Sequence, residues 1–408
     1  MKKLDKLLFH SAIFILLFFG NNVLNFFGFS PTSLLTTILP SFYIIFLLCI
    51  KHFFKPYCCS VYSKRYELIL FVIIFLLLII QIYKGSSGFA GTIINMLLLP
   101  VLFSYLYPEY NEKFKITSRN LLTYFYIINS LWSIGERIIG KNIFPFTGLQ
   151  DPSAIIYSLL GFRSTALQDH PLNNALCLTS IVVFILMSSY YTLRNKIILF
   201  LLGYFAIFCF NTRSSMVLWA VIFIIFLFNV FFSRRNNVRF ITKFRFTIFI
   251  LLMIPVFFYI IQTYQLGDRL MNQDLLDDSA LVRIESMTLF LKSDFMSILW
   301  GLSDQRIEIL MYRANIQIIE NFWIIFFFNY GLVGLSLLIL GFFLLFRHLF
   351  TCYSRFQTLF IVGTFFLLAS TNNSLAVYGQ PLTIFIICCL SYSGTNYSSK
   401  YIRKRIYR

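Results

Sequence analysis

Apolar runs of about 20 residues recur along the whole chain, and each is long enough to cross a hydrocarbon core of about 30 Å. Backbone amides in lipid must be satisfied within the segment, so these runs predict helices. A barrel would show alternating strands of about ten residues instead. Of the residues, 59% are hydrophobic and 12% charged, against roughly 45–50% and 25% in soluble domains. We predict an all-α polytopic membrane protein.

The apolar runs predict about twelve transmembrane helices in a single integral membrane domain over residues 1–408. The first run is longer than the core of a typical signal peptide, and we expect it to be retained as a helix. With an even number of spans, both termini share one side of the membrane. The predicted spans are 7–27, 33–50, 67–83, 89–107, 121–135, 174–193, 197–211, 214–232, 246–262, 321–346, 356–371 and 381–393.

The distribution of charge predicts which side that is. If both termini are cytoplasmic, 24 of the 34 basic residues lie inside, together with only four of the 16 acidic residues. Such an excess of Lys and Arg inside follows the positive-inside rule, so we predict cytoplasmic termini. The net charge of +18 is spread over short inner loops that meet anionic lipids. It therefore does not indicate a nucleic-acid partner.

Two predicted outer loops, about 136–173 and 263–320, are too long to be simple connections. Long ordered loops tend to be functional. Within the second, the acidic stretch Asp274–Asp278 and Ser279 form a good helix start. We expect an amphipathic helix at the membrane surface there, because apolar residues follow at helical spacing: Leu281, Ile284, Met287 and Leu291.

Cofactor motifs are missing from the sequence. It has no phosphate-binding Gly-x-x-x-x-Gly-Lys loop and no Rossmann glycine fingerprint. The adjacent pairs Cys58-Cys59 and Cys388-Cys389 lack the spacing of metal ligands. We therefore expect no cofactor and no metal, and a substrate that is already present at the outer face.

Candidate site residues lie in four predicted outer segments. Arg163 and His170 precede a Pro-Leu-Asn-Asn sequence that leads into a span, although a polar entry turn before a Pro-started helix is the simpler interpretation of His170. Arg213 lies in a very short turn at the membrane interface. A charge is costly there unless the side chain has a functional role or extends to lipid phosphates. The other candidates are Arg283, in the expected amphipathic helix, and Glu320 with Asn321, at the start of a span.

Together these residues suit one kind of chemistry. The guanidinium fork of arginine makes bidentate, charge-assisted hydrogen bonds to diphosphate oxygens. A diphosphate leaving group needs such stabilisation in the transition state, and a sugar hydroxyl needs a positioned base. Lipid-linked saccharides, such as those on undecaprenyl diphosphate, are substrates of this kind at the outer face of a bacterial membrane.

The order and placement of these motifs resemble the superfamily of O-antigen polymerases (Wzy) and O-antigen ligases (WaaL). The resemblance covers roughly residues 160–345. One departure is Ser303, which replaces the second Gly of a Gly-x-Gly. The segments that carry the resemblance are Arg163–Ala175, Asn211–Ser215, Arg283–Gly301 and Glu320–Leu335.

Glu320 distinguishes between the two branches, because ligases carry an essential His at this place. The resemblance therefore favours an O-antigen polymerase, an inverting and metal-independent glycosyltransferase. It implies that Arg213 and Arg283 bind the donor diphosphate and that Glu320 acts as base or orients the acceptor. The implied substrate-binding residues are Arg163, His170 and Asn321.

The resemblance also implies a setting and partners. The site would face the periplasm from the bacterial inner (plasma) membrane. Undecaprenyl-diphosphate-linked oligosaccharides would be both donor and acceptor, membrane lipids would surround the protein, and a polysaccharide chain-length regulator is a candidate partner.

Three alternatives stay open at this point. An O-antigen ligase and a cell-wall glycan polymerase would use similar chemistry. A flippase or transporter for the lipid-linked oligosaccharide would also fit twelve spans. However, major facilitator transporters have a long inner loop between spans six and seven, which here is only Arg194-Asn195-Lys196, and we find no internal repeat.

Overall fold

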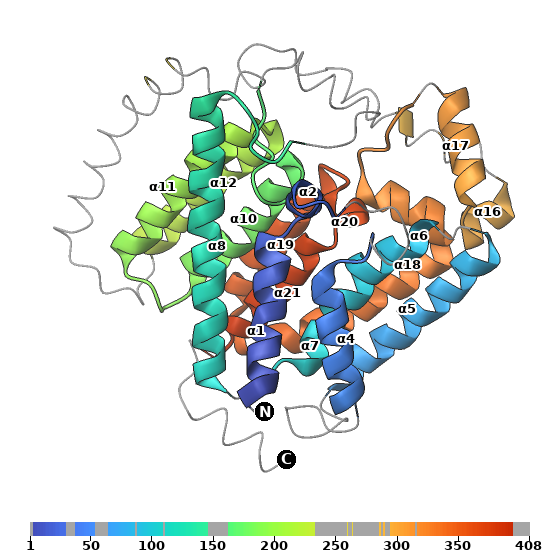
Figure 1. The fold of residues 1–408 in the computed structure, drawn as a ribbon, viewed down its shortest axis with the longest axis horizontal. Helices are drawn as coiled ribbons and strands as arrows, with labels where there is room; N and C mark the ends of the chain where they lie inside the picture. The colour runs from blue at the N-terminus through green and yellow to red at the C-terminus, as the bar shows by residue number, and fades with distance from the viewer. Residues whose placement is uncertain are drawn as a thin grey trace.

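The computed structural model describes residues 3–29, 37–53, 64–85, 88–108, 111–145, 162–232, 294–314 and 316–394, with 259, 263, 285, 286 and 289. All regular secondary structure in these ranges is helical (Figure 1). This confirms the all-α prediction for the residues described. The elements are α1 (Lys3–Phe18), α2 (Asn21–Phe26), α4 (Pro40–His52), α5 (Arg65–Tyr83), α6 (Gly88–Ile93), the π-helix η2 (Ile94–Leu98), α7 (Leu99–Leu106), α8 (Glu112–Ile139), α10 (Pro171–Met187), α11 (Leu193–Phe210), α12 (Arg213–Phe232), α16 (Phe295–Trp300), α17 (Asp304–Arg313), α18 (Phe322–Leu349), the 3-10 helix η4 (Phe350–Cys352), α19 (Arg355–Ser370), α20 (Ser374–Val377) and α21 (Gln380–Ser391).

In the part of the chain that the structure describes, four helices are long and apolar enough to cross a membrane: α5, α11, α12 and α18. Five shorter apolar helices accompany them. Nearly all of α10 and the whole of α21 are buried, whereas Val72, Phe228 and Phe343 are more than half exposed on α5, α12 and α18. Large apolar side chains on the outside suit a helical protein surrounded by lipid. The predicted span 246–262 lies outside the described residues, apart from Tyr259.

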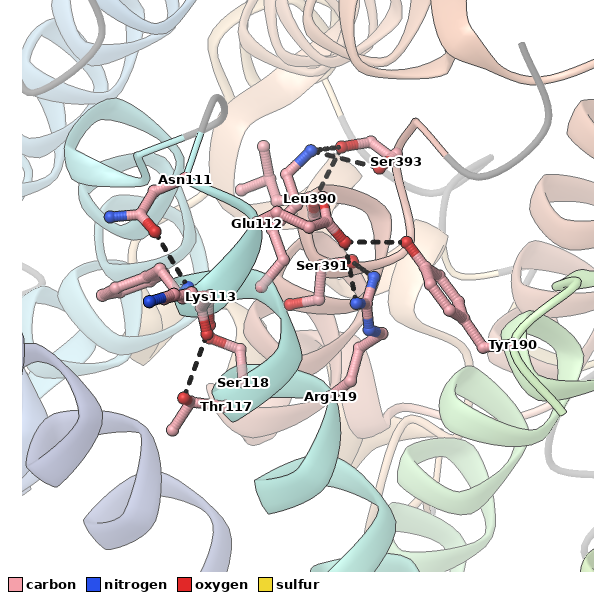
Figure 2. Close-up of polar contacts among 12 residues, drawn as sticks. Asn111, Glu112, Lys113, Thr117, Ser118, Arg119, Tyr190, Leu390, Ser391 and Ser393 are labelled. Atoms are coloured by element: carbon pink, nitrogen blue, oxygen red, sulfur yellow. Dashed lines mark hydrogen bonds and ion pairs between the residues drawn. The ribbon is translucent and has the colours of Figure 1, made fainter. Parts of the chain in front are cut away.

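One end of the bundle, here called the Arg119 end, is closed by a polar network (Figure 2). The Arg119 guanidinium donates to the Glu112 carboxylate at 2.9 Å and to the Ser391 carbonyl oxygen at 3.0 Å. It also lies 3.5 Å from the centroid of the Tyr190 ring, and the Tyr190 hydroxyl donates to Glu112 at 3.0 Å. These contacts join the start of α8, the segment after α10 and the end of α21.

Other basic side chains share the Arg119 end, which also carries the start of α1 (Figure 1). Lys51 pairs with the buried Asp5 carboxylate at 2.7 Å. Lys64 and Glu67 are buried together at 3.3 Å, and Lys115 donates to the Ser393 hydroxyl at 2.9 Å. The charge distribution predicts the cytoplasmic side for all of these basic residues, and in the structure they lie at one end of the protein.

The first predicted span, 7–27, is broken in the structure. α1 ends at Phe18, and α2 begins only at Asn21. The carbonyl oxygen of Leu167 and the carboxylate of Asp169 pack against Gly20, where a Cβ would clash with both. The single-helix prediction for this run was therefore wrong, because a distant loop inserts at the break.

A second break lies in α18. Gly331 has a non-helical backbone with φ of +66°, and the backbone of Leu299 and Gly301 packs directly against it. The Leu302 amide donates to the Phe328 carbonyl oxygen at 2.6 Å. α18 therefore consists of two halves, and the first half contacts the segment that carries α16 and α17.

Candidate functional site

At the end opposite Arg119, residues 162–170 form a loop, here called the Arg163 loop, that is built around a buried carboxylate. Glu136, near the end of α8, is fully buried. Its Oε2 accepts hydrogen bonds from the Ser164 hydroxyl at 2.6 Å and the Ala166 amide at 3.1 Å. Its Oε1 accepts from the Ile143 amide at 2.9 Å. A buried carboxylate needs such donors, and here they hold the loop in one conformation.

The backbone of the Arg163 loop is strained at two positions. Ala166 and Asp169 have φ values of +41° and +64°, which residues other than glycine rarely adopt. Side-chain hydrogen bonds hold the loop in place. The Asn22 amide donates to Asp169 Oδ1 at 2.7 Å, and Gln168 Nε2 donates to the Leu17 carbonyl oxygen at 2.6 Å. Strain of this kind persists where surrounding structure over-determines it, often at functional sites.

The loop carries two of the predicted substrate-binding residues. Arg163 is buried, and its Nε donates to the Phe210 carbonyl oxygen at 3.2 Å. His170 caps α10, which starts at Pro171 as the sequence predicts. The His170 ring stacks on Tyr378, with 5.9 Å between ring centroids.

The contacts of His170 define its protonation. Burial, together with the positive charge of Arg163, lowers the pKa of His170 to about 3, so the ring is neutral near pH 7. Its Nδ1 accepts a hydrogen bond from the Leu172 amide at 3.2 Å. In a neutral ring the proton is then on Nε2. His170 is therefore suited to donate a hydrogen bond and not to act as a base.

Arg213 starts α12 immediately after a tight turn. Asn211 ends α11 with φ of +51°, and only Thr212 separates it from Arg213, as the short predicted turn requires. The neighbouring Ser214 hydroxyl accepts a hydrogen bond from the Thr371 hydroxyl at 3.0 Å. This contact fixes the start of α12 to the connection between α19 and α20.

Glu320 and Asn321 directly precede α18, and Asn321 contacts the same connection. Asn321 caps the helix by accepting from the Trp323 amide at 2.9 Å, and its Nδ2 donates to the Ser370 carbonyl oxygen at 3.3 Å. The Phe322 amide donates to the Asn372 carbonyl oxygen at 3.2 Å.

Residues 370–378, here called the clasp, therefore bring the candidates together. They contact Ser214 beside Arg213, Asn321 beside Glu320, and His170 through Tyr378. Four of the six predicted site residues contact the clasp or directly adjoin a residue that does: His170, Arg213, Glu320 and Asn321. A fifth, Arg163, binds the Phe210 carbonyl oxygen, three residues before Arg213. The sixth, Arg283, lies outside the described residues.

The sequence interpretation missed the clasp, together with Glu136. The available signal was Ser370–Ser374, a run of five polar residues between two apolar runs. For Glu136, the signal was a charged residue directly after a predicted span.

Among the described residues, no group of three or more His, Cys, Asp or Glu side chains could hold a metal ion. The expectation of a metal-independent reaction stays a prediction. In comparisons with known proteins, no family model and no curated protein matches this chain.

Replacement of His170 by glutamine should make the protein less sensitive to acid. The folded-state pKa of His170 lies below the ordinary value of 6.5, so the unfolded state binds the proton more readily. Wild-type stability should therefore fall as pH drops below 6.5, by at most about 1.4 kcal/mol per pH unit from this group. Melting of the detergent-solubilised protein at pH 7.5 and pH 5.5 measures this. Equal acid sensitivity in both proteins would contradict the assigned protonation.

Proposed function

We propose that this protein is a glycan polymerase that joins lipid-linked oligosaccharide repeats at the outer face of a bacterial inner membrane. The observation that carries the proposal is the set of contacts beside the candidate residues, which come from three separate parts of the sequence. The clasp contacts Ser214, beside Arg213, and Asn321, beside Glu320, while Arg163 binds the carbonyl oxygen of Phe210 at the end of α11, three residues before Arg213. Two guanidinium groups and a carboxylate at one end of an apolar helical bundle suit a diphosphate donor and a hydroxyl acceptor.

The proposed membrane arrangement is twelve spans with both termini in the cytoplasm. Two observations support it. Four of the basic residues assigned to the inside lie at the Arg119 end, namely Lys51, Lys64, Lys115 and Arg119, and the candidate site lies at the opposite end. The site would then face the periplasm, where lipid-linked repeats are polymerised.

The proposed reaction is an inverting transfer. A hydroxyl oxygen of the acceptor repeat attacks the anomeric carbon of the donor chain, and a new glycosidic bond forms. The bond between that carbon and the diphosphate oxygen breaks, and undecaprenyl diphosphate leaves with the electron pair. Glu320 takes the hydroxyl proton, while Arg213 and Arg283 stabilise the charge on the leaving group. Arg163, His170 and Asn321 hold the substrate.

A gel of surface polysaccharide tests this function in living cells. A strain without the gene would be complemented with wild type, Glu320→Ala, or Glu308→Ala as a matched control, because Glu308 is an exposed acid on α17. We expect Glu320→Ala to lose the long ladder while a single repeat stays attached to its acceptor, and Glu308→Ala to keep the ladder.

Other patterns on the same gel would overturn the proposal. Loss of even the single repeat indicates a flippase or a ligase. Long polymer that accumulates on undecaprenyl diphosphate then singles out the ligase.

A further inference from the structure

Lys84, directly after α5, lies at a junction that the proposed function does not use. Its ammonium group donates to the carbonyl oxygen of Asn329 at 3.2 Å and to that of Trp300. The amide of the buried Gln81, one turn earlier on α5, donates to the same Asn329 oxygen. α5 and α18 pack side by side, with α16 beside them (Figure 1). The end of α5 thus joins two segments that are distant in sequence.

The two carbonyl oxygens that bind Lys84 belong to helix ends. Trp300 is the last residue of α16, and Asn329 lies in the last turn of the first half of α18, two residues before the break at Gly331. The last carbonyl groups of a helix lack intrahelical partners and carry partial negative charge. The Lys84 ammonium group therefore binds a carbonyl oxygen at both helix ends, and it shares the Asn329 oxygen with Gln81.

The first half of α18 connects this junction to the candidate site. It runs from Phe322 to Asn329, and Glu320 and Asn321 directly precede it. A break in a helix lets its two halves take different directions, so the second half alone does not set the direction of the first. The contacts at Asn329 fix the direction of the first half at one end, and the contacts with the clasp fix it at the other end.

We propose that Lys84 is a positioning residue for the glycosyl transfer proposed above. By binding the two carbonyl oxygens at the junction, its ammonium group fixes the half-helix that begins at Phe322, directly after Glu320 and Asn321. The inference rests on the proposed function, and it assigns Lys84 no contact with substrate.

Three variants test it: Lys84→Met, which keeps the chain length without the donors, Lys84→Arg, which keeps the donors, and Lys141→Met. The last is the matched control, because Lys141 is an exposed cation just after α8. With purified protein in vesicles and a lipid-linked oligosaccharide, we expect Lys84→Met to lower kcat about 10- to 100-fold with little change in KM. Lys84→Arg should restore most of the rate, and Lys141→Met should match wild type.

A second measurement tests whether Lys84 holds the junction together, and it does not depend on catalysis. Trypsin cleaves after Lys and Arg, so we expect limited digestion to cut after Arg306 and Arg313 of α17, which belongs to the segment held at the junction. Lys84→Met should speed these cuts about tenfold, whereas Lys84→Arg should not.

Unchanged kcat and unchanged cleavage in Lys84→Met would overturn the inference. A rise in KM alone would also overturn it, because it would indicate direct contact with substrate. If wild type joins no repeats while Lys84→Met still speeds cleavage, the proposed function fails but Lys84 still holds the junction.

Discussion

Replacing Glu136 by alanine should destabilise the protein and abolish the geometry of the candidate site. The substitution removes the acceptor for the Ser164 hydroxyl and for the amides of Ala166 and Ile143. Hydrogen bonds to a charged group contribute roughly 1.5–3 kcal/mol each. After partial relaxation, we expect a loss of about 4 kcal/mol in the free energy of unfolding.

The effect should extend to the site because the same loop positions Arg163 and His170. Melting in detergent and polymer length in complemented cells measure the two consequences. Glu136→Gln keeps one acceptor oxygen and should fall between wild type and alanine. Glu308→Ala is the control, and it should cost little because Glu308 is an exposed acid on α17. Equal melting of Glu136→Ala and wild type would refute the proposed role of Glu136.

Gly331→Ala should destabilise the protein nearly as much as Glu136→Ala. The φ of +66° at Gly331 is unfavourable for any residue with a Cβ. In addition, the new Cβ would overlap the Leu299 carbonyl oxygen and the Gly301 amide nitrogen. Both obstacles are backbone atoms, which cannot move aside as a flexible side chain can. We expect a loss of about 3 kcal/mol in stability, together with faster trypsin cleavage after Arg306.

Gly363→Ala provides the matched control for that substitution. Gly363 lies inside α19, and a Cβ there would meet nothing within 4 Å. Alanine should leave stability unchanged or raise it by up to about 1 kcal/mol, because glycine is a poor helix former. If both alanine variants melt alike, the close contact between Gly331 and Gly301 does not hold the two segments together.

Local sequence signals were enough to predict several features of the fold. Pro171 after a polar stretch correctly predicted the start of α10. The short polar turn before Arg213 correctly predicted where α11 ends and α12 begins. These features depend on residues that are neighbours in the sequence, such as a proline at a helix start or an asparagine in a left-handed turn.

Features that depend on distant contacts were not predictable in this way. Leu167 and Leu299 pack against Gly20 and Gly331 at the two helix breaks, and a glycine within an apolar run does not reveal such a neighbour. For the same reason, the sequence predicted only an ordinary connection between two spans where the clasp lies. Its importance lies in what Thr371 and Tyr378 contact, and those partners are about 160 to 210 residues away in the sequence.

The most direct test of the central claim is elongation by the purified protein. Vesicles containing the protein would receive an undecaprenyl-diphosphate-linked repeat, and product length and released undecaprenyl diphosphate would be measured together. We expect products of two or more repeats, one lipid diphosphate released for each new bond, and a rate lowered about 10²- to 10⁴-fold in Glu320→Ala. Wild-type protein that leaves the repeat unextended, or Glu320→Ala that extends it at the wild-type rate, would contradict the account.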